Sequence, residues 1–266
     1  MTARPLVMGV LNVTPDSFSD GGRYLAHAAA IARGRELVAA GAQIVDVGGE
    51  STRPGAVRVG SEEEIARVLP VLEALHAEGI TTSLDTMNAA TARAALAAGV
   101  DYINDVSSGG ADPEMLRVVA AGDAGFIAGH WRGFLDPADS HAHYADPAAE
   151  VAAELAATAG RLAAAGINRE RVILDPGLGF SKTGEHNWAV LRGLDELSRL
   201  GYPLLIGASR KRFLGELLPA QATVHDRDLP TAVLSALLAD RGIWGVRVHE
   251  PAATAAALDV WEHLRR

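Results

Sequence analysis

Residues that could do chemistry recur along the chain at the ends of short apolar runs. In chain order they are Asn12, Asp46, Asp85, Asn104 with Asp105, Asp175, Ser209 with Arg210 and Lys211, and Arg247 with His249. A single Asp or Asn in such a place often only caps a turn or the next helix. Capping alone does not explain why polar groups close so many runs, so we interpret them as parts of one binding site.

The first members of this set are acidic or neutral. Asp85, Asn104 and Asp175 offer several hydrogen-bond acceptors, which suit a flat heterocycle that presents N–H groups. Asn12 adds a neutral oxygen ligand, which Mg²⁺ accepts when phosphates and water fill most of its shell. These residues predict a heterocycle site beside a place for a metal-bound phosphate.

The last members of the set are basic. Lys211, Arg247 and His249 offer positive charge, which suits phosphate groups. A helix is predicted to begin at Pro251, a residue favoured in a first helical turn, so its free N–H groups would open beside His249. This side of the site is therefore predicted to bind an anion.

Lys211 is unusual in its residue type. Of 24 lysines and arginines only two, Lys182 and Lys211, are lysines, and arginine stands on both sides of Lys211 in the stretch GASRKRFLG. A compact ammonium on a flexible stem can donate to a ring carbonyl or ring nitrogen without the broad planar fork of arginine. We therefore interpret Lys211 as functional; chance placement of a rare residue is the alternative.

The apolar runs themselves predict the elements that position these residues. They cover residues 7–13, 44–49, 81–86, 102–107, 125–131, 172–177, 203–209 and 245–250, and Ala/Leu-rich helical segments lie between them. Nearly continuous apolar strands that alternate with helices indicate a parallel sheet covered by helices. Eight such units without a linker favour a single α/β domain over residues 1–266, a (β/α)8 or TIM barrel. An open doubly wound sheet is the alternative.

Two connections, after the first and second predicted strands, are long. Residues 14–24 and 50–60 are rich in glycine and polar side chains. Long βα loops in compact barrels often act as lids, so we expect both to close over the barrel mouth. Ordinary surface variation is the alternative.

Composition excludes several classes of protein. A net charge of −9 argues against a general nucleic-acid binder, whose binding surface would be basic. No apolar run reaches the length of a membrane span, and the apolar start before Asn12 is too short for a secretion signal. Without cysteine there is no disulfide, thiolate metal site or cysteine nucleophile, which suits a location in the cytoplasm.

Seven segments together resemble the dihydropteroate synthase family of folate biosynthesis. They are MGVLNVTPDSFSDGG (8–22), VDVGGESTRPGA (45–56), LDTMNAATARAALAAG (84–99), INDVSSG (103–109), LDPGLGFSKTGEHN (174–187), IGASRKRFLG (206–215) and GVRVHE (245–250). They occur in order over nearly the whole chain and cover most strand–loop junctions. This is a far more specific signal than a single glycine motif.

The resemblance implies a fold, a reaction and partners. The fold would be a pterin-binding (β/α)8 barrel. The reaction would join 6-hydroxymethyl-7,8-dihydropterin pyrophosphate to p-aminobenzoate, giving 7,8-dihydropteroate and pyrophosphate, and the family is inhibited by sulfonamides. Mg²⁺ would be the cofactor, and the protein would form a homodimer with no nucleic-acid or membrane partner.

The resemblance also gives the matching residues their roles. The pterin would be held by Asp85, Asn104, Asp175 and Lys211. The pyrophosphate would be held by Asn12, through Mg²⁺, and by Arg247 and His249. The closing loops and the aminobenzoate side would use Thr52, Arg53, Pro54, Phe180 and Arg212, with Lys211 close by. The catalytic residues would be Asp85, Lys211, Arg247, His249 and Arg53.

The implied mechanism fits these residue types. If C–O cleavage runs ahead of attack by the amine, the pterin methylene becomes cationic while pyrophosphate gathers negative charge. Asp85 and Asp175 would stabilise the cation, and Arg247, His249 and Mg²⁺ would stabilise the leaving group. No covalent nucleophile on the enzyme is needed.

Three departures from the family pattern stand out. Arg212 replaces the serine that many members have after the lysine, so the aminobenzoate contact is expected to differ in detail. Gly129 stands where a larger residue is expected before His130, which predicts a looser pterin pocket on that side, and His130 is given no role. Residues 132–146 match no family motif.

Three alternatives stay open. A methyltetrahydrofolate-type methyltransferase barrel would share the pterin acceptors but would not need the cluster of Lys211, Arg247 and His249. A catalytically silent paralogue would have lost some of the site residues, whereas this chain keeps them. A phosphate-binding sugar or amino-acid barrel leaves the acidic half of the site unexplained.

Overall fold

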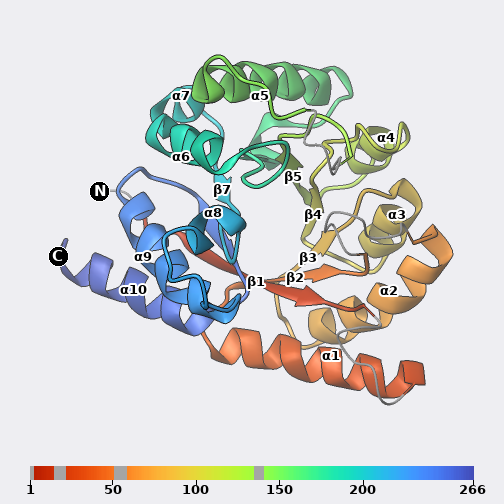
Figure 1. Cartoon of the computed structure of the whole chain (residues 1–266). Coiled ribbons are helices and arrows are strands. Elements are labelled where there is room, and N and C mark those ends of the chain that lie inside the picture. The colour runs from red at the N-terminus through yellow and green to blue at the C-terminus, as the bar shows by residue number, and fades with distance from the viewer. Residues whose placement is uncertain (1–2, 15–21, 51–58, 135–140) are drawn as a thin grey trace.

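Eight parallel strands form a ring in the computed structural model, which describes residues 3–14, 22–50, 59–134 and 141–266 (Figure 1). They are β1 (Leu6–Asn12), β2 (Ile44–Gly48), β3 (Thr82–Asp85), β4 (Tyr102–Asp105), β5 (Gly125–Gly129), β6 (Val172–Asp175), β7 (Leu205–Ile206) and β8 (Gly245–Val248). Parallel ladders link neighbours in the order β6-β5-β4-β3-β2-β1-β8-β7. A single parallel bridge, between Leu174 and Leu204, joins β6 to the residue before β7. The predicted barrel is confirmed, and the open sheet is wrong.

Helices connect successive strands and cover the outside of the ring (Figure 1). They are α1 (Gly22–Ala39), α2 (Ser61–Ala77), α3 (Ala89–Ala97), α4 (Met115–Ala120), α5 (Pro147–Ala164), α6 (Gly184–Arg192), α7 (Leu194–Ser198), α8 (Arg212–Gly215), α9 (Asp228–Ala239) and α10 (Pro251–His263), with short 3-10 turns η2 (Arg169–Arg171) and η3 (His225–Arg227). Within the described ranges, none of these helices has the length and apolarity that a membrane crossing requires.

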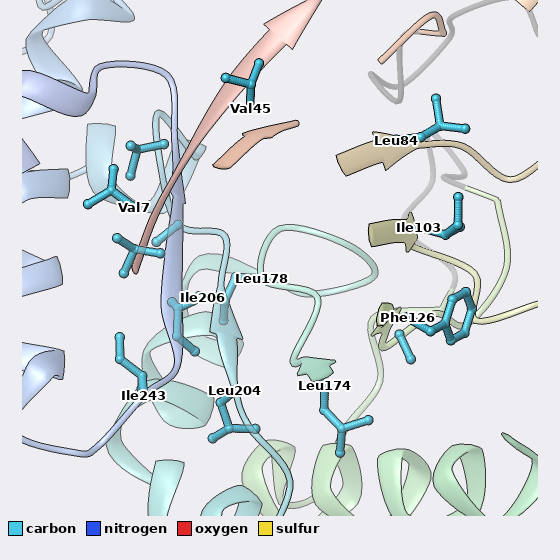
Figure 2. Packing of buried hydrophobic residues seen from close by; sticks show 14 of the residues in the cluster. Val7, Val45, Leu84, Ile103, Phe126, Leu174, Leu178, Leu204, Ile206 and Ile243 are labelled. Carbon is cyan, nitrogen blue, oxygen red and sulfur yellow. The ribbon is translucent and has the colours of Figure 1, made fainter. Parts of the chain in front are cut away.

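Buried side chains form two separate layers, because successive residues of a strand point to opposite faces. Val45, Leu84 and Phe126 belong to the larger cluster, which packs between the strands and the surrounding helices (Figure 2). The smaller cluster fills the inside of the ring and consists of Met8, Ile44, Ile127, Ile173 and Leu205. The barrel therefore has a dry apolar floor of its own.

The same alternation explains why polar residues lie directly above this floor. Asp46 follows Ile44 by two positions on β2, and Asp175 follows Ile173 by two positions on β6. Each pair shares the inward face of its strand, with the acid nearer the carboxyl end. The strand pattern thus places a layer of acidic side chains directly above a buried apolar layer.

Gly129, at the end of β5, has no empty space beside it. A Cβ at this position would lie 2.6 Å from the carbonyl oxygen of Val106 and 2.7 Å from its Cα. The carbonyl oxygen of Gly129 also accepts a hydrogen bond of 2.6 Å from Ser108 Oγ. The expected loosening on this side is wrong, because the backbone after β4 occupies the space that a larger side chain would need.

This packing predicts opposite effects of alanine at two glycines. Gly129→Ala should lower the free energy of unfolding by about 1–3 kcal/mol, because the Val106 backbone must move. Gly160→Ala, inside α5 with no atom within 4 Å of the new Cβ, should raise it by about 0.5–1 kcal/mol. Urea denaturation of both variants measures the difference; a Gly129→Ala protein as stable as the native chain would contradict the packing argument.

Candidate active site at the mouth of the barrel

The predicted polar residues do meet at one end of the barrel. Asn12 ends β1, Asp85 ends β3 and Asp175 ends β6, while Asn104 and Arg247 stand one position before the ends of β4 and β8. In a parallel barrel the carboxyl ends of all strands lie at the same end of the barrel, so these five side chains surround one mouth.

Arg247 links three strands through its guanidinium group. Its Nε donates to Asp46 Oδ2 at 2.6 Å, and its Nη2 donates to Asp85 Oδ2 at 2.7 Å. Asn104 Nδ2 donates to the same Asp46 oxygen at 3.2 Å. Asp46 is fully buried, and its second oxygen has no partner among the described residues. The sequence analysis places Asp46 in the predicted site without a specific role; its position two residues after the inward-facing Ile44 is the signal for its place beneath Arg247.

Burial sets the charge balance of this cluster. It raises the pKa of Asp85 to about 7, an effect that Arg247 opposes and the nearby Asp46 carboxylate reinforces. Burial alone would lower the pKa of Arg247, but the two carboxylates outweigh it and hold that pKa above its ordinary value. The guanidinium therefore stays charged, while Asp85 can gain or lose a proton near neutral pH.

Lys211 lies across the mouth, beside the loop that follows β6. Its Nζ is 4.2 Å from the centre of the Phe180 ring, and no hydrogen bond of its side chain is present in the described part of the chain. Burial lowers the pKa of Lys211 to about 8, partly offset by the Asp175 carboxylate. Burial also raises the pKa of Asp175, which accepts a hydrogen bond of 2.7 Å from Gly177 N. Within the described residues the Lys211 side chain therefore has hydrogen-bond donors left for a ligand, and its contact with a substrate stays a prediction.

The phosphate side differs from expectation in two ways. His249 Nδ1 is 3.0 Å from Ser209 Oγ, and burial, with the nearby Arg247, lowers the pKa of His249 to about 3. The ring is therefore neutral at pH 7 in this structure, which differs from the positive charge that the sequence predicted; its contact with a phosphate stays a prediction. Helix α10 does begin at Pro251, but Glu250 caps it by accepting from Ala252 N at 3.3 Å, so that N–H is not free.

Asn12 is suited to hold a metal only together with a ligand. Asn12 Oδ1 lies beside Gly48 and close to Asp85 at the rim, 3.7 Å from where a Cβ of residue 48 would be. Its side-chain amide has no hydrogen-bond partner within the described ranges. No group of three or more His, Asp or Glu side chains that could bind a metal occurs in that part of the chain. One neutral oxygen at the rim fits Mg²⁺ that takes its other ligands from phosphate and water.

The aminobenzoate residues are only partly placed. Thr52, Arg53 and Pro54 lie outside the described residues. Phe180 is half-buried against Lys211, as the predicted site requires. Arg212 opens α8 with a side chain that is 91% exposed and pairs with Glu216 at 3.3 Å, so in this state it faces solvent rather than the mouth.

The second lysine is the residue that sequence reasoning passed over. Lys182 is only 6% exposed, and its Nζ lies 2.9 Å from His130 Nδ1. Neither residue was given a role. The rarity of lysine in the chain was the signal that could have drawn attention to it.

Comparisons with known proteins agree with this geometry. The family model described as pterin binding enzyme matches residues 8–249. The dihydropteroate synthase of Mycobacterium leprae (strain TN) is 51% identical over 265 residues, which cover 97% of this chain and 93% of the relative. The structure of Xanthomonas albilineans dihydropteroate synthase with 4-aminobenzoic acid has a TM-score of 0.91 at 42% identity, covering 98% and 93% of the two chains. That of Yersinia pestis dihydropteroate synthase with a sulfonamide drug has a TM-score of 0.91 at 37% identity, covering 98% and 94%.

The charge cluster makes a testable statement about stability. Arg247→Met should lower the free energy of unfolding at pH 8 by about 3–5 kcal/mol, because Asp46 and Asp85 lose their cation. Arg241→Met, which breaks the exposed pair with Asp195, should cost less than about 1 kcal/mol. Urea denaturation of both variants measures this.

The same experiment has a pH dependence of known sign. Folding raises the pKa of Asp85 above its unfolded value, and loss of Arg247 would raise it further. The folded variant then binds more protons than the unfolded chain, so its stability rises as the pH falls from 8 toward 5. A deficit of the Arg247→Met protein that stays constant over this range would contradict the assigned charges.

Proposed function

The chain belongs to the dihydropteroate synthase family of pterin-binding enzymes, and on that basis we propose how its residues carry out the family reaction. The substrates are 6-hydroxymethyl-7,8-dihydropterin pyrophosphate and p-aminobenzoate, and the products are 7,8-dihydropteroate and pyrophosphate. The observation that supports this assignment to residues best is the single mouth in which Arg247 lies between buried acids and a phosphate-binding side. Opposite charges develop on the substrate during the reaction, and the site provides for both.

The acids would act on the pterin. Loss of pyrophosphate leaves positive charge on the pterin methylene, and the carboxylates of Asp85 and Asp175 would stabilise that charge while accepting ring N–H groups. Asn104 would add a further polar contact, and Lys211 would donate to a ring carbonyl or nitrogen. Because Lys211 has no hydrogen bond within the described residues, a pterin acceptor would replace water rather than break a protein contact.

The leaving group would be held by charge and by directed donors. Two nitrogens of Arg247 are already engaged by Asp46 and Asp85, which leaves Nη1 for a phosphate oxygen. With the Ser209 hydroxyl donating to Nδ1 of His249, Nε2 carries the ring hydrogen and can donate it to the pyrophosphate. Stabilising the departing oxygens speeds C–O cleavage without a covalent intermediate.

We propose that Mg²⁺ assists at the rim. Asn12 would be its protein ligand, and the pyrophosphate and water would complete the shell. The ion would neutralise charge on the leaving group. This division of ligands is consistent with the single neutral oxygen that the chain offers there.

The p-aminobenzoate would bind against Phe180, beside Lys211. Sulfonamides, which one structural neighbour binds, would compete for that position. Arg212, exposed in this state, would contact the carboxylate only by turning away from Glu216. Amine attack on the pterin methylene then follows from proximity.

We also propose a homodimer located in the cytoplasm. On α9, Leu229, Val233 and Leu237 are 71%, 50% and 66% exposed at spacings of four residues, which makes one apolar stripe along the helix. Such a stripe favours contact with a second copy. A chain without cysteine is compatible with a reducing compartment.

The proposed function predicts a defined activity. With Mg²⁺ and both substrates the native protein should release pyrophosphate and form dihydropteroate in equal amounts, and EDTA should stop both. Lys211→Arg should lower kcat/KM by roughly a hundredfold, because the broad planar guanidinium cannot replace the compact ammonium as donor to a single pterin carbonyl or ring nitrogen in the tight space beside Gly179.

Arg241→Lys, at an exposed pair that precedes β8 and so lies at the end of the strand opposite the mouth, is the matched control and should turn over like the native chain. A Lys211→Arg protein with native kinetics would remove Lys211 from the site. Pterin binding without any turnover in the native chain would instead favour the silent paralogue.

Assembly is tested separately. Leu237→Glu should convert the native dimer, of twice the chain mass of 27.7 kDa, to a monomer. Val38→Glu, an exposed apolar residue on α1, should leave the dimer intact. Size-exclusion chromatography with light scattering measures the mass, and a native chain that elutes as a monomer would exclude the stripe as a dimer contact.

A further inference from the structure

The buried ammonium of Lys182 uses all of its donors inside the protein. It lies 2.9 Å from His130 Nδ1 and donates to the carbonyl oxygens of Gly177 at 3.1 Å and Phe180 at 3.2 Å. No carboxylate accepts from it directly in the described part of the chain. An ammonium has three hydrogens, so none is left for a ligand. Lys182 is therefore not a substrate-binding group, and its buried charge needs another explanation.

His130 is fixed from its other side. Its Nε2 lies 2.9 Å from Glu154 Oε2, and Arg132 holds the same carboxylate through Nε and Nη2. Since Lys182 donates to Nδ1, the ring hydrogen lies on Nε2 and is donated to Glu154. Burial, with the nearby Lys182, lowers the pKa of His130 to about 4, so the ring is a neutral acceptor at pH 7. Lys182 thus faces a rigid acceptor anchored on α5.

The two carbonyls belong to a loop that needs such an anchor. Between β6 and α6, Gly177, Gly179 and Ser181 have φ angles of 63°, 76° and 48°. Left-handed backbone at a serine is unfavourable, and carbonyls that converge on one point repel each other without a donor between them. The Lys182 ammonium is that donor, and it connects the start of the loop to its end.

This loop forms the wall against which Lys211 packs. A Cβ built on Gly179 would lie 2.8 Å from Lys211 Cδ, and the Lys211 ammonium rests over the Phe180 ring. Asp175 begins the loop, and its backbone oxygen accepts from His130 N at 2.8 Å. The contacts that place Lys211 in the mouth are therefore made by residues that Lys182 and His130 hold.

We propose that Lys182 is a positioning residue, which folds the loop after β6 around its ammonium and so holds Phe180, Gly179 and Lys211 in the reactive arrangement. The catalytic importance of Lys182 rests on the proposed function of the site. Its effect on the loop and on the pKa of Lys211 does not depend on that function. Lys182 acts through the loop, since no donor of its own reaches the mouth.

The charge of Lys182 depends on pH. Burial lowers the pKa of Lys182 to about 7, while Asp175 and Glu154 raise it and Arg132 and Lys211 lower it, so the anchoring ammonium is fully present only below that pH. Removing the ammonium would loosen the loop and let water reach Lys211. Because burial is what lowers the pKa of Lys211 to about 8, that hydration would raise it toward its ordinary value.

The chain's composition allows a clean chemical test. It has no cysteine, so Lys182→Cys creates a single thiol. Alkylation of the denatured variant with bromoethylamine, followed by refolding, restores an ammonium on a stem of almost the same length. Methylthiolation of the same variant gives a neutral side chain and is the matched control. Lys182→Met, produced without refolding, repeats the neutral case.

Two readouts are followed in each folded protein. The first is the pKa of Lys211, from the pH dependence of trace acetylation of its peptide, which mass spectrometry resolves because lysines occur only at 182 and 211. The second is the kinetics with p-aminobenzoate. Neutral residues at 182 should raise the pKa of Lys211 by about one unit and lower kcat/KM for p-aminobenzoate by about tenfold or more. The aminoethyl protein should behave like the native chain in both readouts.

Each outcome decides the proposal. Folded neutral variants with a native Lys211 pKa and native kinetics would overturn it. Equal defects in the neutral and aminoethyl proteins would also overturn it, because the charge would then be irrelevant. A native chain without turnover would count against the proposed function, but the Lys211 titration would still test the positioning role.

Discussion

The guanidinium of Arg247 is the interaction on which the mouth of the barrel depends. Asp46 and Asp85 lie on neighbouring strands above a buried apolar layer, and the same guanidinium donates a hydrogen bond to each of them. Arg247 reaches them from β8, past β1, so one ionic cluster joins the end of the chain to its first half. A pterin and a pyrophosphate would therefore bind to charged groups that are already paired with one another in the folded protein.

Much of this arrangement follows from local sequence pattern. The alternation of apolar strands and helical segments predicts the barrel, and the position of a residue along its strand predicts whether it faces inward. Asp85, Asn104 and Asp175 were found that way, because polar residues at strand ends need no knowledge of their neighbours. Lys211 is singled out by its residue type, and the structure places its ammonium beside Phe180 without a hydrogen bond to any described residue.

The remainder depends on contacts between residues far apart in the chain. Nothing local in β2 shows that Asp46 will meet a guanidinium 201 positions away, or that Lys182 will donate to His130 across 52 positions. The neutrality of His249 comes from burial beside other cations, and composition counts the same histidine as a possible charge. Glu250 follows β8 directly, and from the sequence such a carboxylate could equally be a site residue or a helix cap; the structure shows that it caps α10. In each case the deciding quantity is a distance or a degree of burial.

The ring of strands has one narrow joint, where a single bridge between Leu174 and Leu204 links β6 to β7. Asp175 follows directly on one side of this joint, and Lys211 lies beyond the strand on the other. A ligand that accepts from Lys211 and donates to Asp175 would therefore connect the two sides through hydrogen bonds that no pair of described residues makes. Occupancy and the integrity of the ring are thermodynamically linked, and substrate acts as a removable cross-strand connection. We therefore expect a bound substrate to stabilise the barrel at the β6–β7 contact.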